Sequence, residues 1–209
     1  MSRNEKHNAK VGAGVNCKLN KIFFRNSERR KRLAKITIFG LAGTGTTSVG
    51  EMLASNLGHT FLSSGNLFRE KSVKLGIEVS KLEKICLTNP KYDFELDEYI
   101  SKFGRTNNNF VVESRLAYHF IPDSIKIKLV CDYVTRIQRV ARRQDMPTSV
   151  ASEETNFRER AANKRYHKLY GIKKLAPDKH FHLIIDTSRR SVEETAAIIV
   201  SKFKLPDIR

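Results

Sequence analysis

The sequence predicts a single α/β domain in which a five-stranded parallel sheet carries helices on both faces. From residue 35 onward, short apolar runs rich in β-forming residues alternate with longer segments of helical periodicity, the order typical of a parallel sheet. A glycine-rich stretch at residues 40–47 joins the first apolar run to the first helical segment. The chain has 209 residues, which is enough for one such domain with a sizeable core.

Local start and stop signals support the individual helices. Gly58 and Gly76 follow segments of helical periodicity and are fitting stops, since glycine readily adopts the left-handed backbone that ends many helices. Ser63 or Ser64 is placed to cap one helix, and Ser191 is placed to cap the last. The expected helices are residues 46–57, 66–75, 79–87, 93–103, 134–143 and 152–170, with a final helix after Ser191.

The strands are predicted from short runs of apolar and β-forming residues. At residues 125–131 apolar side chains alternate with two lysines, which indicates a strand. The run at residues 36–39 ends at Gly40, where the chain is free to turn. The expected strands are residues 36–39, 60–62, 110–113, 125–131 and 181–185.

The charge is unevenly distributed. The net charge is +17 and the pI is near 10.0, which indicates polyanionic partners such as nucleotides, nucleic acid or anionic lipid. Residues 1–34 hold ten basic and two acidic side chains, a charge of +8, and so leave +9 for residues 35–209. We therefore divide the chain into a basic arm at residues 1–34, expected to be disordered, and a domain at residues 35–209. The run Arg29-Arg30-Lys31-Arg32 leaves weak nucleic-acid or membrane contact open, and the arm leaves organellar targeting open.

Cysteine and hydropathy patterns argue against several protein classes. Cys17, Cys86 and Cys131 are scattered without C-x-x-C spacing, so neither a zinc site nor a disulfide framework is expected. No apolar run approaches the roughly 18 residues of a membrane-spanning helix. The expectation is a cytoplasmic protein without a membrane span.

The glycine-rich stretch has the features of a phosphate-binding loop, or P-loop. Its glycines permit backbone conformations that turn successive amides inward, and the following helix directs its positive end at the same point. Thr47 occupies the hydroxyl position that binds Mg²⁺ in such loops, but Thr46 stands where the general pattern G-x-x-x-x-G-K-[ST] has lysine. A charge-assisted contact is worth roughly 1.5–3 kcal/mol, so we expect arginines from elsewhere to replace that lysine. The residues expected to bind the triphosphate are Gly40, Gly43, Thr44, Gly45, Thr46 and Thr47.

Arginines are expected at the same edge of the sheet. Arg69 and Arg115 follow the second and third strands, and ligands of open α/β sheets bind at the carboxyl ends of strands. Two arginines there could hold a second phosphate through fork-like hydrogen bonds. A helix further along the chain carries four arginines at i, i+3 and i+4 spacings, so several of them reach one face: Arg136, Arg139, Arg142 and Arg143.

Taken together, these segments resemble nucleoside monophosphate kinases, and most closely the archaeal-type (type 2) cytidylate kinase family. The likeness covers about residues 35–203 and follows the family's motif order. The loop G-x-x-G-T-G-T-T is similar to that family's loop, which also lacks lysine. The other matching pieces are Ser64-Gly65 with Phe68-Arg69-Glu70, Asn89-Pro90 with Asp93 and Leu96-Asp97, Glu113-Ser114-Arg115-Leu116-Ala117, Arg158-Glu159, Lys164-Arg165-Tyr166 and Tyr170-Gly171-Ile172.

The resemblance implies a P-loop NTPase fold with an acceptor-binding helical insert at residues 64–105 and a lid at residues 143–165. It implies phosphoryl transfer from ATP, with Mg²⁺, to CMP or dCMP. Ser64, Arg69 and Arg115 would bind the acceptor. Arg139 would lie near the donor base. Charge on the transferred group would be neutralised by Arg143, Arg158 and Arg165.

Departures from the family pattern leave alternatives open. Asn66 replaces an acidic residue, Ser114 replaces glycine, and Lys173 and His182 stand where the family usually has Asp. A kinase of the same fold for another small acceptor such as AMP, and a catalytically degraded nucleotide- or RNA-binding protein, are the alternatives. By analogy with other kinases of this architecture, we expect a monomer.

Overall fold

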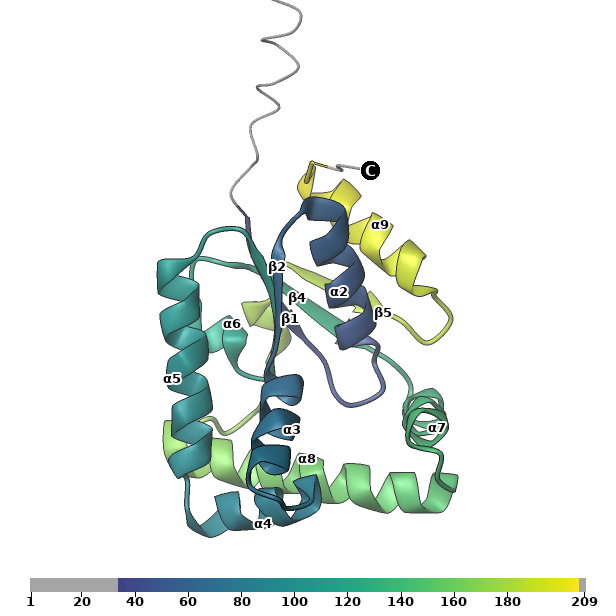
Figure 1. Ribbon diagram of the computed structural model, residues 1–209. Coiled ribbons are helices and arrows are strands. Elements are labelled where there is room, and N and C mark those ends of the chain that lie inside the picture. Colours follow the sequence, from purple (N-terminus) through teal and green to yellow (C-terminus); the bar gives the residue numbers. More distant parts are fainter. Residues whose placement is uncertain (1–33, 207–209) are drawn as a thin grey trace, which may run out of the picture. The chain divides into compact units, whose positions relative to one another are not determined.

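The computed structural model of the protein describes residues 34–206. The predictions for the basic arm, including Cys17, therefore concern residues almost wholly outside the described part. Within it, five parallel strands form one sheet in the order β2-β3-β1-β4-β5 (Figure 1), which confirms the predicted fold class. The strands are β1 (Lys35–Phe39), β2 (Thr60–Ser63), β3 (Phe110–Glu113), β4 (Ile125–Val130) and β5 (Leu183–Asp186).

Helices cover both faces of the sheet and its carboxyl edge. In Figure 1, α2 and α9 lie side by side on one face, whereas α5 and α6 lie on the other. The remaining helices gather where the strands end, with α8 running across that edge and packing against α4 and α7. The helices are α2 (Thr46–Leu57), α3 (Ser64–Lys74), α4 (Val79–Thr88), α5 (Lys91–Thr106), α6 (Ala117–Phe120), α7 (Tyr133–Gln144), α8 (Thr148–Tyr170) and α9 (Val192–Phe203).

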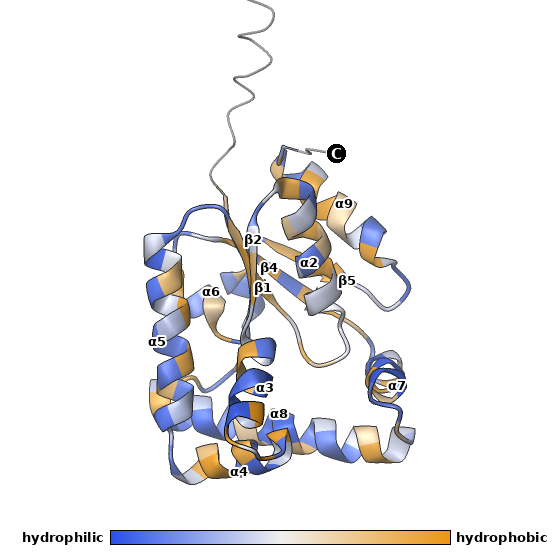
Figure 2. Ribbon diagram, in the orientation of Figure 1, coloured by the Kyte–Doolittle hydropathy of each residue, from blue (hydrophilic) through white to orange (hydrophobic). Residues whose placement is uncertain are grey.

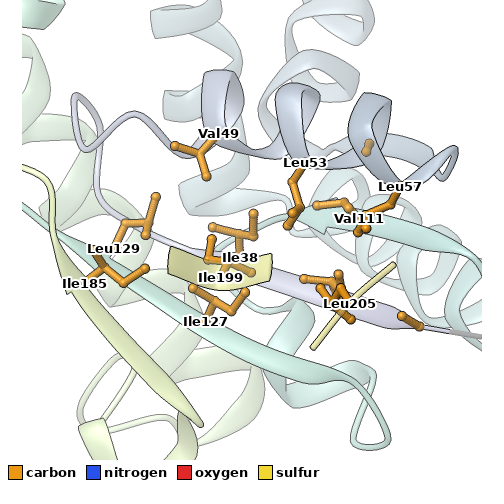
Figure 3. Packing of buried hydrophobic residues seen from close by; sticks show 13 residues of the cluster. Ile38, Val49, Leu53, Leu57, Val111, Ile127, Leu129, Ile185, Ile199 and Leu205 are labelled. Atoms are coloured by element: carbon orange, nitrogen blue, oxygen red, sulfur yellow. The ribbon is translucent and has the colours of Figure 1, made fainter. Parts of the chain in front are cut away.

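The main core lies between the sheet and the pair α2 and α9. Val49, Leu53 and Leu57 of α2 point at the strands, and Ile199 of α9 meets the same cluster (Figure 3). Figure 2 shows the apolar colouring of β1 at the centre of the sheet. Since each fully buried aliphatic side chain contributes about 1.5–3 kcal/mol, this layer fixes β1 and α2, the two elements that flank the glycine-rich loop.

A second core lies on the opposite face. Phe110 and Val112 of β3 pack against Ile100 of α5 and Ile121, which follows α6, and all four are fully buried. The alternation of side chains along β3 sends Val111 to the first core and its two neighbours to the second. The end of β3 is thus held from both sides, with Glu113 at its last position.

Several predicted boundaries were wrong. The helix expected from residue 152 begins at Thr148, because Pro147 suits a helix start and Ala151 packs against α7. The strand expected at residues 181–185 is Leu183–Asp186, since the Phe181 ring packs on Phe39 outside the ladder. Two short elements, α6 and a 3₁₀ turn at Asp178–His180, were not predicted, because such short pieces carry little periodicity.

Candidate functional site

The glycine-rich loop links β1 to α2 and has the backbone of an anion-binding turn. Gly43 and Gly45 have φ angles of 85° and 86°, in the left-handed region that favours glycine. Thr44 closes the turn, because both its amide and its hydroxyl donate to the Leu41 carbonyl, at 3.1 and 2.8 Å. Gly45 is the N-cap of α2 and offers no side chain to cap it. The first amides of α2 are therefore left for a ligand.

Side chains beside the loop donate hydrogen bonds to its carbonyl oxygens. Arg136 Nε donates to the Ala42 carbonyl at 2.8 Å, and the Thr187 hydroxyl donates to the Thr44 carbonyl at 2.9 Å. In a trans peptide the C=O and the following N–H point in opposite directions. The amides of Gly43 and Gly45 are thus turned away from these anchors. The loop is therefore held in a conformation in which these two backbone amides remain available to a ligand.

Thr46, which stands at the position of the usual lysine, contacts a carboxylate. Its hydroxyl donates to Glu113 Oε1 at 3.1 Å, and the Ser63 hydroxyl donates to Glu113 Oε2. Ser63 ends β2 and Glu113 ends β3 in register with it. One carboxylate therefore joins the loop after β1 to the loop after β2.

All residues predicted to bind substrates line one cavity of about 430 Å³ beside the glycine-rich loop. The loop residues, Ser64, Arg69 and Arg115 contribute, and so do the arginines that the family resemblance assigned to the transferred group and the donor base. Thr187, Arg190 and Glu113 line it as well, although no role was predicted for them. The arginines that meet here come from α3, the β3–α6 turn, α7 and α8: Arg69, Arg115, Arg139, Arg143, Arg158 and Arg165.

The middle of the cavity is electropositive. Burial lowers the pKa of Arg69, and the neighbouring Arg143 lowers it further, while Glu113 opposes the shift. The Asn66 side chain accepts a hydrogen bond from Arg69. Asn66 thus orients Arg69 without adding the negative charge that an acidic residue would bring. Such an arrangement of like charges is suited to a polyanion.

Arg139 sits at the loop end of the cavity. Its guanidinium donates to the Thr187 carbonyl at 2.8 Å and lies 3.4 Å from the Gly43 carbonyl oxygen. These contacts fix it beside the glycine-rich loop and the turn after β5. Arg136, one turn earlier on α7, is buried and ion-paired with Glu159, so it supports the loop from behind.

The far end of the cavity holds a buried acid–base cluster. Arg165 NH1 lies 2.8 Å from Glu83 Oε2, and Arg165 Nε lies 3.1 Å from Asp93 Oδ2, with all three side chains 6% exposed. Burial alone would lower the pKa of Arg165, but the two carboxylates outweigh it and raise that pKa. Arg165 was expected to neutralise the transferred group, and the structure shows its guanidinium held by carboxylates on two sides.

Asp97 lies next to this cluster and is 8% exposed. The Tyr170 hydroxyl donates to Asp97 Oδ2 at 2.6 Å. Burial raises the pKa of Asp97 to about 7, because that hydrogen bond only partly offsets the loss of water and nearby Asp93 adds to the shift. The contact ties the end of α8 to α5.

The four residues that depart from the family pattern have different surroundings in the structure. The Ser114 side chain is buried and accepts from the Leu116 amide at 3.2 Å, so it stabilises the turn rather than lining the cavity. The His182 ring accepts from the Lys126 amide at 3.0 Å and so links the start of β5 to β4. Lys173 is exposed. Of the four, Asn66 alone contacts a cavity-lining arginine in the contacts of the described residues.

The part of the chain that the structure describes has no cluster of metal-binding side chains and no membrane-spanning helix. Between residues 34 and 206, no group of three or more His, Cys, Asp or Glu side chains is arranged to hold a metal ion. The Thr47 hydroxyl and the Glu113 carboxylate, both lining the cavity, are oxygen ligands of the kind that Mg²⁺ takes. Across that same range no helix has the length and apolarity to cross a membrane.

Glu83, Glu113 and Thr187 are the functional candidates that sequence reasoning missed. Glu113 gave a usable signal, because it ends a predicted strand at the edge where ligands bind. Thr187 follows the last strand and gave the same weaker signal. Glu83 gave none, since a single glutamate on a helix is normally solvent-exposed.

The chain matches the model of the cytidylate kinase-like family over residues 35–189. A cytidylate kinase of Methanobrevibacter smithii is 32% identical over 170 residues, which is 81% of this chain and 98% of the relative. A cytidylate kinase of Desulfurococcus amylolyticus is 33% identical and covers 81% of this chain and 92% of the relative. Among solved structures, shikimate kinase from Acinetobacter baumannii has a TM-score of 0.57 at 17% identity and covers 88% of this chain and 99% of that one.

The structural likeness establishes the P-loop kinase fold, and the sequence likeness extends over most of the domain. The residues predicted to bind substrates line one cavity. This chain is a member of the cytidylate kinase-like family.

Proposed function

We propose that the protein transfers the terminal phosphoryl group of ATP to CMP or dCMP, releasing ADP and the nucleoside diphosphate. Its family is one of nucleoside monophosphate kinases. The observation that carries the proposal is the single cavity in which the glycine-rich loop faces a group of arginines from four separate elements. One anion site for the donor and another for the acceptor are what a phosphoryl transfer between two phosphates requires.

The donor triphosphate binds the amides of the glycine-rich loop in this mechanism. Thr46 adds no positive charge there and is hydrogen-bonded to Glu113. Arg143 and Arg158, which line the cavity from α7 and α8, supply the compensating charge. Arg139 lies beside the loop, where the nucleoside part of the donor leaves it.

The acceptor phosphate lies between Arg69 and Arg115, beside Ser64. An oxygen of that phosphate attacks the terminal phosphorus of ATP, a new P–O bond forms, and the bond to the bridging oxygen breaks as ADP leaves. The protein performs no covalent step. It brings the two phosphates together and spreads positive charge over the transferred group.

Mg²⁺ would accompany ATP, and the residues present fit it. Magnesium prefers oxygen ligands and keeps several waters, so one or two protein oxygens suffice. The Thr47 hydroxyl and the Glu113 carboxylate, which line the cavity beside the loop, are of that type. When bound, the ion would offset negative charge on the phosphates.

The choice of CMP rests on the acceptor end of the cavity. Apolar Phe68, Val79 and Leu96 line it together with Asp93 and Arg165. A carboxylate accepts hydrogen bonds from an exocyclic amine, and a guanidinium donates to ring nitrogen or carbonyl oxygen. Cytosine presents that combination. Uracil would set a carbonyl against the carboxylate, so we expect discrimination against UMP.

A screen of monophosphates tests the proposal. ADP release from ATP and Mg²⁺ is measured in a coupled assay with CMP, dCMP, UMP, AMP or no acceptor. We expect rapid release with CMP or dCMP and little with the others. Turnover with AMP alone would replace the proposed acceptor. No turnover with any acceptor, together with RNA retention that falls steeply with salt, would favour a binding protein.

A further inference from the structure

Glu83 lies between two arginines of the cavity. It belongs to α4, is 4% exposed, and faces α8. Its Oε2 lies 2.8 Å from Arg165 NH1, and its Oε1 lies 3.6 Å from Arg158 Nε. Residues 158 and 165 are seven positions apart, about two helical turns, and therefore share one face of α8. A single carboxylate thus serves both arginines.

The two arginines are held unequally. Arg165 has a second carboxylate, that of Asp93, at 3.1 Å. The contact of Arg158 with Glu83 is too long for a hydrogen bond, and Arg158 Nε has no hydrogen-bond partner among the described residues. The Arg158 side chain is 21% exposed, compared with 6% for Arg165. Arg165 is therefore locked, whereas Arg158 keeps its donors for an incoming anion.

Repulsion would move Arg158 out of an empty site. Burial lowers the pKa of Arg158; Glu83 opposes that shift, whereas Arg115, Arg69 and Arg143 add to it. The three neighbouring arginines thus disfavour a fourth positive charge when no phosphate is present. The Glu83 carboxylate supplies the opposing attraction.

We propose that Glu83 is a positioning residue that holds Arg158 beside the anion site before the substrates arrive, with Arg165 fixing the Glu83 carboxylate in place. The inference rests on the proposed kinase function. Stabilising charge is most effective in a transition state when it needs no rearrangement as the reaction proceeds. The role of Glu83 is to spare Arg158 that rearrangement. Glu83 itself touches no substrate in this scheme.

The test compares Glu83→Gln with a matched control, Glu78→Gln. Glu78 precedes α4, and its side chain accepts a hydrogen bond from Ser80. We expect Glu83→Gln to lower kcat about tenfold and to change the KM for CMP by a smaller factor, since Arg165 keeps its contact with Asp93. That pattern marks loss of an interaction made in the transition state. The control should keep the kinetics of the unaltered protein. A kcat for Glu83→Gln within twofold of the unaltered protein would overturn the inference.

A double-mutant cycle separates positioning from a general loss of stability. If Glu83 acts through Arg158, then Glu83→Gln should cause no further loss of kcat in an Arg158→Ala background. An equal loss in both backgrounds would show that Glu83 acts otherwise and would overturn the inference. If Glu83→Gln shows no cooperative thermal transition, Glu83→Asp takes its place. Aspartate keeps the negative charge, but its side chain is one methylene shorter. Glu83→Asp should lower kcat only in a protein that still has Arg158.

The outcomes distinguish the inference from the proposed function. Normal turnover of CMP by the unaltered protein, with an unaffected Glu83→Gln variant, refutes the positioning role and leaves the kinase function intact. Absence of turnover with every monophosphate refutes both.

Discussion

Asp97→Asn should stabilise the protein at high pH. Asp97 is buried, accepts a hydrogen bond from Tyr170, and lies near two further titratable or charged groups, Asp93 and Arg165. Asparagine has nearly the same shape, and its side-chain oxygen can still accept from the tyrosine hydroxyl. The substitution removes a charge and keeps the contact between α5 and α8.

The size of the effect follows from the pKa of Asp97, which burial raises from 3.8 to about 7. Between these values the folded state binds a proton that the unfolded state releases, so the free energy of unfolding falls as pH rises. About three pKa units correspond to about 4 kcal/mol, lost between about pH 4 and pH 7 and constant above about pH 8. Asp97→Asn should therefore gain up to about 4 kcal/mol over the unaltered protein at pH 8, with little difference near pH 4.

Urea denaturation from pH 4 to pH 8 measures this difference. Asp123→Asn is the control, because Asp123 pairs with Lys35 at 2.8 Å and that contact lowers its pKa. Asp123→Asn should therefore lower the free energy of unfolding at pH values above the ordinary carboxyl pKa. This change has the opposite sign to that expected for Asp97→Asn. The reasoning fails if Asp97→Asn is the less stable protein at pH 8, or if its difference from the unaltered protein does not change with pH.

Four further substitutions address the loop, a control glycine, the proposed acceptor site and the ion pair that supports the loop. A Cβ at Gly43 would lie 2.3 Å from the Arg136 carbonyl oxygen at a φ of +85°, so Gly43→Ala should lose ATP binding in calorimetry and roughly 2 kcal/mol or more of stability. Gly76→Ala, at +63° in open space, should cost only about 1 kcal/mol. Arg115→Ala should raise the KM for the acceptor and lower kcat/KM at least tenfold, and unchanged kinetics would refute the assigned contact. Glu159→Gln leaves the buried Arg136 unpaired and should cost about 3–5 kcal/mol in urea denaturation, whereas a neutral result would show that water compensates the guanidinium.

The sequence predicted most of the fold because its signals were local. Helix α2 was predicted with its observed bounds, since Gly58 adopts the left-handed conformation, with a φ of 60°, that ends it. The cap of α3 proved to be Ser63, whose side chain accepts from the Asn66 amide. Boundaries were missed where tertiary contacts decide, as at Ala151, whose packing on α7 extends α8 toward its N-terminus.

The roles of the site residues stay predictions, but the structure shows where the predicted side chains lie. Arginines that follow strands or repeat along a helix are visible in a sequence, and Arg69, Arg115, Arg139 and Arg143 line the cavity. Arg136 of the same helix instead pairs with Glu159. What no local pattern reveals is which partner each arginine meets. Arg165 and Glu83 are 82 residues apart, and Thr187 and Thr44 are 143 residues apart, yet each pair forms a hydrogen bond. Such pairs depend on the packing of whole helices and strands.

The sheet also sets the distance between the two loops that follow β1 and β2. The glycine-rich loop follows β1, Glu113 ends β3, and Ser63 ends β2, on three adjacent strands. Ser63 and Glu113 are in register, and Glu113 pairs with Ile38, one residue before the end of β1. Neighbouring strands are about 4.8 Å apart, so the two loops start roughly 10 Å from each other, whatever their side chains. If the proposed acceptor site is right, changes in its side chains can alter which molecule is recognised while the backbone hydrogen bonds of the sheet keep the spacing of the two loops constant.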